Sequence, residues 1–135
     1  MTEYKSSIQH ISYPSEKVFN KLSNLRNLES LTPIIGNQVS DFQCDENACS
    51  FKVDAFGTFG FEIVEKTPFQ TIQIKSSNAP VDFSGLISIE QTGSDQCTLQ
   101  ITLLVDLPFF LKAMISSKLE EGIEKVVQII GGLNY

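Results

Sequence analysis

The single histidine, His10, limits the chemistry that this sequence can support. A histidine-rich metal site is excluded, and a serine or cysteine triad could use only this residue as its base. His10 stands beside Ile8 and Ile11 in a predicted strand, and no nucleophile in the sequence can be assigned to it. We interpret it as an ordinary strand residue or a residue at the edge of a cavity, and we predict no catalytic residue, no metal and no cofactor.

The cysteines Cys44, Cys49 and Cys97 are an odd number with no C-x-x-C pair. This pattern predicts reduced thiols in a reducing compartment. Cys44 and Cys49 could face each other across a short turn, but we expect no structural disulfide. No basic residue adjoins any of the three in the sequence, so we interpret them as small buried hydrophobic side chains rather than as reactive thiolates.

The remaining polar motifs have structural interpretations. The segment Gly57 to Gly60 lacks both the Gly-Lys-Ser/Thr ending of a phosphate loop and a following helix, so we interpret it as a turn between strands. Asp45 and Glu46 fit a solvated hairpin tip, and Glu120, Glu121 and Glu124 fit the wet face of a helix.

Size and charge exclude several classes of protein. The chain has 135 residues and a mass of 15.0 kDa, enough for one domain spanning residues 1–135. Its formal net charge of −6 disfavours nucleic acid as a partner. No segment has the roughly 20 apolar residues of a membrane span, and the first residues show no secretory or transit signal. We expect a soluble, cytoplasmic protein that is a monomer or a homodimer.

The elements that must position any site begin with a strand, Tyr4 to Ser12, and a helix from Pro14 to Ser23. Leucines at helical spacing from Leu25 to Leu31 predict a second short helix, which must end near Pro33. The pattern then becomes alternating, with turn residues between the runs, which is typical of an antiparallel meander. We predict six further strands: Gln38 to Gln43, Ala48 to Asp54, Thr58 to Lys66, Thr71 to Ser77, Val81 to Gln91 and Cys97 to Asp106.

One long helix, from Pro108 to Ile130, is predicted to close the chain, with Gly131 and Gly132 after its end. Its apolar stripe should cover the buried face of the sheet, with Gly122 against that sheet. The stripe comprises Ile115, Leu119, Gly122, Ile123, Val126, Ile129 and Ile130. Phe109, Phe110 and Met114 lie off this stripe, so the first turns present apolar side chains over a wider arc.

The order of these elements resembles the helix-grip fold of the START-related SRPBCC superfamily, which includes polyketide cyclase/dehydrase-like and birch-pollen-allergen-like proteins. The resemblance covers nearly the whole chain and rests on four segments. They are Tyr13 to Phe19, Leu25 to Pro33, Glu65 to Pro68, and the amphipathic tail after Leu107-Pro108. The chain departs from the common pattern because it contains no tryptophan.

This resemblance implies an α+β fold in which a seven-stranded curved antiparallel sheet wraps around the long C-terminal helix, with two short helices between the first two strands. It also implies a cavity between sheet and helix. Alternation along the strands supplies candidates to line that cavity. They are Phe51, Val53, Phe59, Phe61, Ile63, Ile72, Ile74, Phe83, Ile87, Leu103, Phe110 and Met114. Candidate polar contacts are His10, Tyr13, Ser84 and Ser88.

The leading hypothesis is non-catalytic binding of a small hydrophobic or amphipathic molecule, such as a lipid, in this cavity. A polyketide cyclase/dehydrase-like enzyme is an alternative that would require an ionisable group inside the cavity. A protein-interaction or dimerisation module, docking through Phe109, Phe110 and Met114, is a third hypothesis. The same phenylalanines could also simply fill a core.

Overall fold

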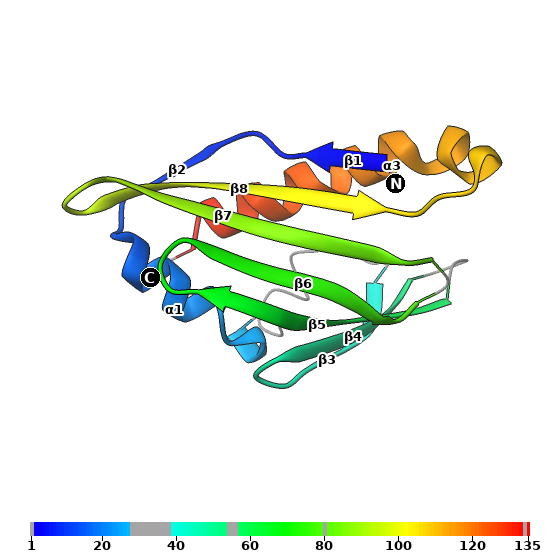
Figure 1. Cartoon of the computed structure of the whole chain (residues 1–135), viewed down its shortest axis with the longest axis horizontal. Helices are drawn as coiled ribbons and strands as arrows, with labels where there is room; N and C mark the ends of the chain where they lie inside the picture. Colours follow the sequence, from blue (N-terminus) through cyan, green and yellow to red (C-terminus); the bar gives the residue numbers. More distant parts are fainter. Residues whose placement is uncertain (1, 28–38, 54–56, 80, 134) are drawn as a thin grey trace.

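The polypeptide forms a curved antiparallel sheet with two helices on one side of it (Figure 1). The computed structural model describes residues 2–27, 39–53, 57–79, 81–133 and 135. Within these ranges the architecture is α+β, as the sequence predicts. We call the helix-bearing face of the sheet the inner face and the opposite one the outer face.

The elements follow each other as two short strands, a helix, six strands and a long helix. Their bounds are β1 Thr2–Lys5, β2 Gln9–Ile11, α1 Ser15–Leu22, β3 Val39–Cys44, β4 Ala48–Val53, β5 Gly57–Thr67, β6 Thr71–Asn78, β7 Phe83–Gly93, β8 Gln96–Val105 and α3 Phe109–Gly131. Residues 25–27 form a 3₁₀ turn, and the rest of the predicted second helix lies outside the described residues. The strand order is β1-β8-β7-β6-β5-β4-β3, with β2 also paired to β8.

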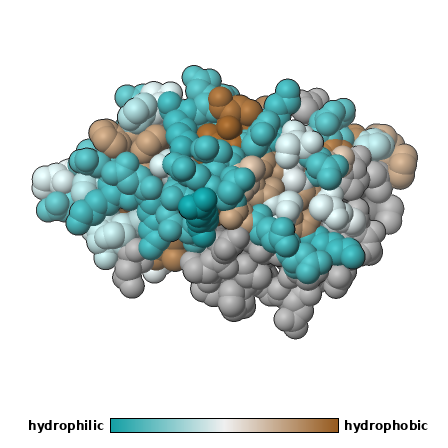
Figure 2. All heavy atoms as spheres, turned by 90° about the horizontal axis from the view of Figure 1, so that it is seen from below, coloured by the Kyte–Doolittle hydropathy of each residue, from teal (hydrophilic) through white to brown (hydrophobic). Residues whose placement is uncertain are grey.

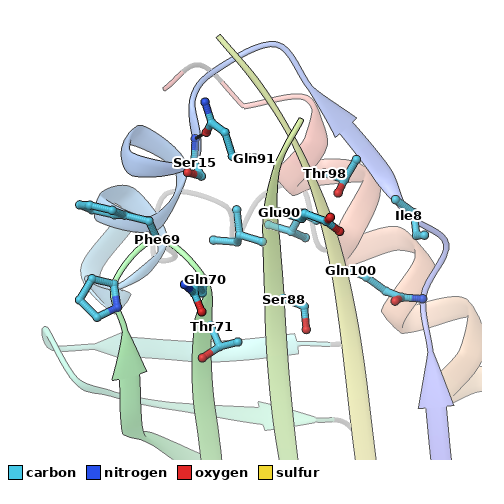
Figure 3. A pocket seen from close by; sticks show the side chains of 13 residues that line it. Ile8, Ser15, Phe69, Gln70, Thr71, Ser88, Glu90, Gln91, Thr98 and Gln100 are labelled. Carbon is cyan, nitrogen blue, oxygen red and sulfur yellow. Dashed lines mark hydrogen bonds between the residues drawn. The ribbon is translucent and has the colours of Figure 1, made fainter. Parts of the chain in front are cut away.

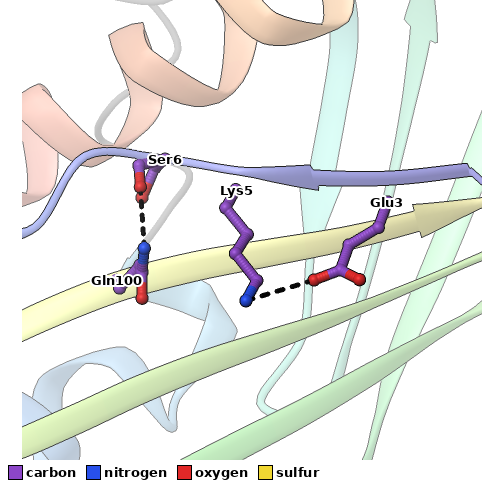
Figure 4. A network of polar contacts seen from close by, with 4 residues as sticks. All are labelled: Glu3, Lys5, Ser6 and Gln100. Carbon is purple, nitrogen blue, oxygen red and sulfur yellow. Dashed lines mark hydrogen bonds and ion pairs between the residues drawn. The ribbon is translucent and has the colours of Figure 1, made fainter.

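The opening strand differs from its prediction. The sequence predicts one strand and a seven-stranded sheet, whereas the described part of the sheet has eight strands, because residues 6–8 separate β1 from β2. Ser6 is buried, and its hydroxyl accepts a hydrogen bond from the Ile101 N–H at 2.9 Å. Gln100 donates its side-chain N–H to the Ser6 carbonyl oxygen at 3.0 Å (Figure 4). Side-chain hydrogen bonds thus replace part of the ladder here.

Helix α3 is rotated from the orientation that its apolar stripe predicts. Ile123, Val127 and Ile130 are buried, while Gly122 is exposed and a Cβ atom built on it would meet nothing within 4 Å. Val126 is 38% exposed. The predicted contact of Gly122 with the sheet is therefore wrong. The reason is that α3 packs on β8, β1 and β2, which lie at one edge of the sheet. There, hydrogen bonds between Tyr4 and Ser116 and from Ser7 to Glu124 fix the rotation of the helix about its axis.

Most of the core forms where α1 and the last turns of α3 meet the inner face. Val18, Ile72 and Val127 have no exposed surface, and they belong to one cluster with Phe19 and Leu99. A second, smaller cluster joins Tyr4, Val105 and Ile123 beside the earlier turns of α3. Each buried aliphatic side chain contributes about 1.5–3 kcal/mol. These clusters hold α3 beside the strands that carry the candidate site.

Candidate functional site

Four phenylalanine rings on β4, β5 and β7 lie against one another on the inner face. We call Phe51, Phe59, Phe61 and Phe83 the phenylalanine cluster. Phe51 stacks on Phe59 with ring centroids 5.8 Å apart, contacts Phe61 edge-on at 6.2 Å, and Phe59 lies 6.3 Å from Phe83. Aromatic pairs at such separations are mutually stabilising. All four are only partly buried, so the cluster presents aromatic surface instead of being sealed in the core.

Aliphatic side chains continue this surface toward the core. Ile72 is fully buried, and Ile63 and Ile87 pack against the same cluster as Ile72. Leu103 packs against the second cluster, beside Phe83. Gly85 on β7 is buried opposite Ile74 on β6. A Cβ atom built on Gly85 would lie 2.9 Å from the Ile74 Cγ1, so the absence of a side chain at Gly85 leaves the space that the Ile74 side chain occupies.

The structure brings nine of the twelve predicted lining residues together on the inner face. Phe110 is the exception among those whose side chains are described, because it lies in the first turn of α3 and is 66% exposed. The side chains of Val53 and Met114 lie outside the described part of the structure.

Three of the four predicted polar contacts are on the wrong side of the sheet. His10 pairs with Thr98, and its neighbour Ile11 is the residue that turns to the core. Ser84 and Ser88 alternate with the inward Phe83, Gly85 and Ile87, so they point to the outer face. The expectation that they contact a ligand held on the inner face is therefore corrected.

Tyr13, the fourth predicted polar contact, does lie on the core side. Its ring meets Tyr135 edge-on at 5.6 Å. The Tyr135 hydroxyl donates a hydrogen bond to the Ile130 carbonyl oxygen at 2.6 Å. Burial raises the pKa of Tyr135 well above its ordinary value, so this phenol stays protonated and does not act as a base at neutral pH. The tyrosine pair closes the end of the core near the chain terminus.

Along β7 and β8, the inward side chains are apolar except for the thiol of Cys97 and the amide of Gln91, whose oxygen accepts a hydrogen bond from the Ser15 N–H at 2.7 Å. Cys97 is buried, and burial raises the pKa of its thiol. A buried thiol with a raised pKa is a poor nucleophile, because the thiolate is the reactive form. Among the described residues, histidine, cysteine and acidic side chains nowhere gather in a group of three that could hold a metal ion. This part of the inner face suits an apolar molecule.

The outer face carries a shallow depression of about 650 Å³ (Figure 3). Ser88 and Glu90 from β7 and Thr98 and Gln100 from β8 line it, with two exposed apolar side chains, Ile8 and Phe69, at its margins. Neither the alternation along the strands nor any motif predicts this hollow, because it arises where the residues between β1 and β2 and the β5–β6 turn border the sheet.

Cys44 and Cys49 form a disulfide across the β3–β4 hairpin, contrary to the expectation of reduced thiols. They are directly opposite each other in the strand register, with Cα atoms 4.1 Å apart. The turn between them was predicted, but the spacing alone does not fix a register. Cys97 remains a free thiol.

Exposed apolar side chains are scattered. Phe109 is 89% exposed beside Phe110 at the start of α3, whereas Val126 lies far along the same helix and Ile8, Val64 and Phe69 lie in other parts of the fold. Figure 2 shows a face in which hydrophobic atoms form separate patches among hydrophilic ones. Within the described ranges, no helix combines the length and apolar character that a membrane crossing requires.

No family model matches the sequence, and no curated protein matches it. Solved structures do match over almost the whole chain. Truncated norcoclaurine synthase from Thalictrum flavum has a TM-score of 0.67 at 6% identity, covering 98% of this chain and 95% of that one. A START superfamily protein from Mycobacterium smegmatis has a TM-score of 0.61 at 15% identity, covering 95% and 98%.

A third match, a protein of Deinococcus radiodurans, has a TM-score of 0.60 at 18% identity and covers 98% of this chain and 100% of its own. Because the sequence identities are this low, the matches show similarity of fold only. The curved sheet, the C-terminal helix and these matches together show that the chain has a START/SRPBCC-type helix-grip fold.

Proposed function

We propose that the protein binds a small hydrophobic or amphipathic molecule against the phenylalanine cluster, without catalysing a reaction. The observation that carries the proposal is the partial exposure of all four rings on the inner face. Aromatic side chains left partly uncovered beside an apolar sheet surface provide the shape and the desolvation on which binding of apolar ligands depends.

The position of α3 supports this location. The helix packs on β8, β1 and β2, whereas the cluster extends across β4, β5 and β7. Similar folds hold small molecules in at least one case, since norcoclaurine synthase has been solved in complex with dopamine and hydroxybenzaldehyde. That structure matches this chain with a TM-score of 0.65 at 8% identity and covers 99% of it.

Native mass spectrometry of the protein purified from its own host tests the proposal. An intact mass that exceeds the denatured mass would reveal a bound molecule, and its size would follow from the difference. Phe59→Ala combined with Phe83→Ala should reduce that excess, because both rings belong to the cluster. Phe109→Ala is the matched control, since this ring is 89% exposed and lies outside the cluster. Equal loss in both variants would refute the assignment.

A second candidate function, docking of a partner or of another copy, is favoured by the adjacent exposed rings of Phe109 and Phe110. Light scattering at increasing concentration tests it. A dimer in the wild type that becomes a monomer in the Phe109→Ser/Phe110→Ser variant would support docking, and a monomer at every concentration would exclude self-association.

The enzyme hypothesis and the cytoplasmic location stay predictions. A cyclase or dehydratase would need an acid or a base beside the ligand, and the inward residues of β7 and β8 offer only the buried Cys97 thiol. The location is tested by the redox state of Cys44 and Cys49 in cells, because cytosolic disulfides are usually transient.

A further inference from the structure

The disulfide of the β3–β4 hairpin joins two residues that the strand pairing already places opposite each other. Asp45 donates its backbone N–H to the Ala48 carbonyl oxygen at 2.9 Å, which closes the turn. The Asp45 carboxylate accepts hydrogen bonds from the N–H groups of Asn47 at 2.9 Å and Ala48 at 2.8 Å. The hairpin tip is therefore formed by hydrogen bonds that do not need the disulfide.

A crosslink in this position constrains the unfolded chain less than one that closes a long loop. The two cysteines are five residues apart, and the stabilisation that a disulfide gives by restricting the unfolded chain is smallest for such short loops. The tip is also joined to the rest of the molecule, because Leu25 donates its N–H to the Glu46 carbonyl at 2.9 Å and Ile63 donates to that of Asn47 at 2.8 Å. Reduction should leave the hairpin in place, with both sulfurs still close together.

The two cysteine residues differ in their exposure to solvent. Cys49 is 3% exposed, whereas Cys44 is only half-buried. Both residues line a depression of about 390 Å³ beside the hairpin. Thiol–disulfide exchange requires the incoming thiolate to reach one sulfur along the S–S axis, so accessibility decides which sulfur is attacked. Because Cys44 is the more exposed residue, we expect its sulfur to be the one attacked.

The structure also provides for the reduced state. The Cys49 Sγ lies 3.8 Å from the carbonyl oxygen of Leu25. A disulfide sulfur has no proton to donate, but the thiol formed by reduction could donate its S–H to this oxygen. In the reduced form, the buried Cys49 thiol therefore has the Leu25 carbonyl oxygen as a hydrogen-bond acceptor.

We propose that Cys44 and Cys49 are a reversible redox site that reacts with low-molecular-weight thiols through Cys44. A thiolate attacks the Cys44 sulfur, the Cys44–Cys49 bond breaks, and Cys49 leaves as a thiolate that takes up a proton. A second thiolate attacks the external sulfur of the mixed disulfide, so that Cys44 leaves as a thiolate and is protonated. Two external thiols are oxidised to one disulfide, and the protein disulfide is reduced by two electrons.

Glutathione is the probe that tests this proposal, with Cys97→Ser as the background so that only the pair can react. In oxidised glutathione, the Cys49→Ser chain should gain one glutathione at Cys44, detected by intact mass. The Cys44→Ser chain should react at Cys49 at least about tenfold more slowly, because its thiol is buried. The same two chains in urea are the control, where both thiols should react at similar rates.

Equal rates for the two folded variants, or no reaction at Cys44, would overturn the proposal. The thermal midpoint gives a second, independent readout on the Cys97→Ser chain. Reduction by an excess of reduced glutathione should lower it by no more than about 10 °C, because the loop that the disulfide closes is short. A failure of reduced glutathione to open the disulfide, or a loss of the folded state on reduction, would contradict a reversible site.

Discussion

The Glu124 carboxylate on α3 accepts hydrogen bonds from both the backbone N–H and the hydroxyl of Ser7, which lies between β1 and β2. The hydroxyl bond is 2.9 Å long and joins residues 117 positions apart in the sequence. The contact occurs between β1 and β2, where the Ser7 N–H has no partner on a neighbouring strand within the described ranges. The Glu124 side chain therefore satisfies this N–H group and also holds α3 against that edge of the sheet.

The Ser7–Glu124 contact should make stability depend on pH. Hydrogen bonds from Ser7 lower the pKa of Glu124 below its ordinary value of 4.5. Because the folded-state pKa is the lower one, the stabilisation is complete above the unfolded-state pKa and is lost as the pH falls through the folded-state pKa. Glu124→Gln should therefore lower the urea midpoint at pH 7, with the difference from wild type vanishing in strong acid.

Glu121→Gln provides the matched control for that experiment. Glu121 is an exposed residue on the same helix, one turn before Glu124. Its substitution should leave the urea midpoint unchanged at each pH. A loss as large as that of Glu124→Gln would show that general helix charge, rather than the Ser7 contact, is responsible.

The rotation of α3 is tested by two adjacent valines. Val127 has no exposed surface and Val126 is 38% exposed. Val127→Ala should lower the free energy of unfolding by about 2 kcal/mol, because two buried methyl groups are lost and a cavity remains. Val126→Ala should change it by less than about 0.5 kcal/mol. Chemical denaturation measures both, and the reverse ranking would restore the helix orientation that the sequence pattern predicts.

Gly85→Val should destabilise the sheet by about 1–3 kcal/mol, because the added side chain overlaps Ile74 in a packed layer. The Cβ atom alone would lie 2.9 Å from the Ile74 Cγ1. The unfolding midpoint of this variant measures the effect, and an unchanged midpoint would mean that Ile74 can move aside without loss.

Gly122→Ala should stabilise the protein, in contrast to Gly85→Val. Gly122 lies inside α3 with nothing within 4 Å of a built Cβ atom, so alanine gains helix propensity without a clash. We expect the free energy of unfolding to increase by about 0.4–1 kcal/mol. A decrease would indicate that the sheet does approach this position.

The strands of the meander could be predicted from sequence because each is an alternating run between turn residues. The predicted strand Thr71 to Ser77 is β6 Thr71–Asn78, and Ala48 to Asp54 is β4 Ala48–Val53. The same alternation predicts that the rings of Phe51, Phe59, Phe61 and Phe83 lie on one face of the sheet, where the structure has them in contact. A period of two residues fixes the face of a strand once one inward residue is identified.

The features that sequence reasoning missed depend on contacts distant in the chain. The interruption at Ser6 is set by hydrogen bonds with Gln100 and Ile101, which follow about 95 residues later. The rotation of α3 is set by Ser7 and by Tyr4, whose hydroxyl lies 2.8 Å from the Ser116 hydroxyl. A helical stripe specifies a face only to within about one residue, so such contacts decide the orientation.

The absence of tryptophan allows the most direct test of the proposed binding surface. Phe59→Trp introduces a single tryptophan into the phenylalanine cluster, and Phe109→Trp introduces one at an exposed position, so either can be excited selectively over the tyrosines. The probe is 9,10-dibromostearate, whose bromine atoms quench tryptophan only at short range, with stearate as the non-quenching competitor. Binding against the cluster predicts saturable quenching in Phe59→Trp that stearate reverses, and little quenching in Phe109→Trp. Equal quenching in both variants, or none in Phe59→Trp, would contradict the account.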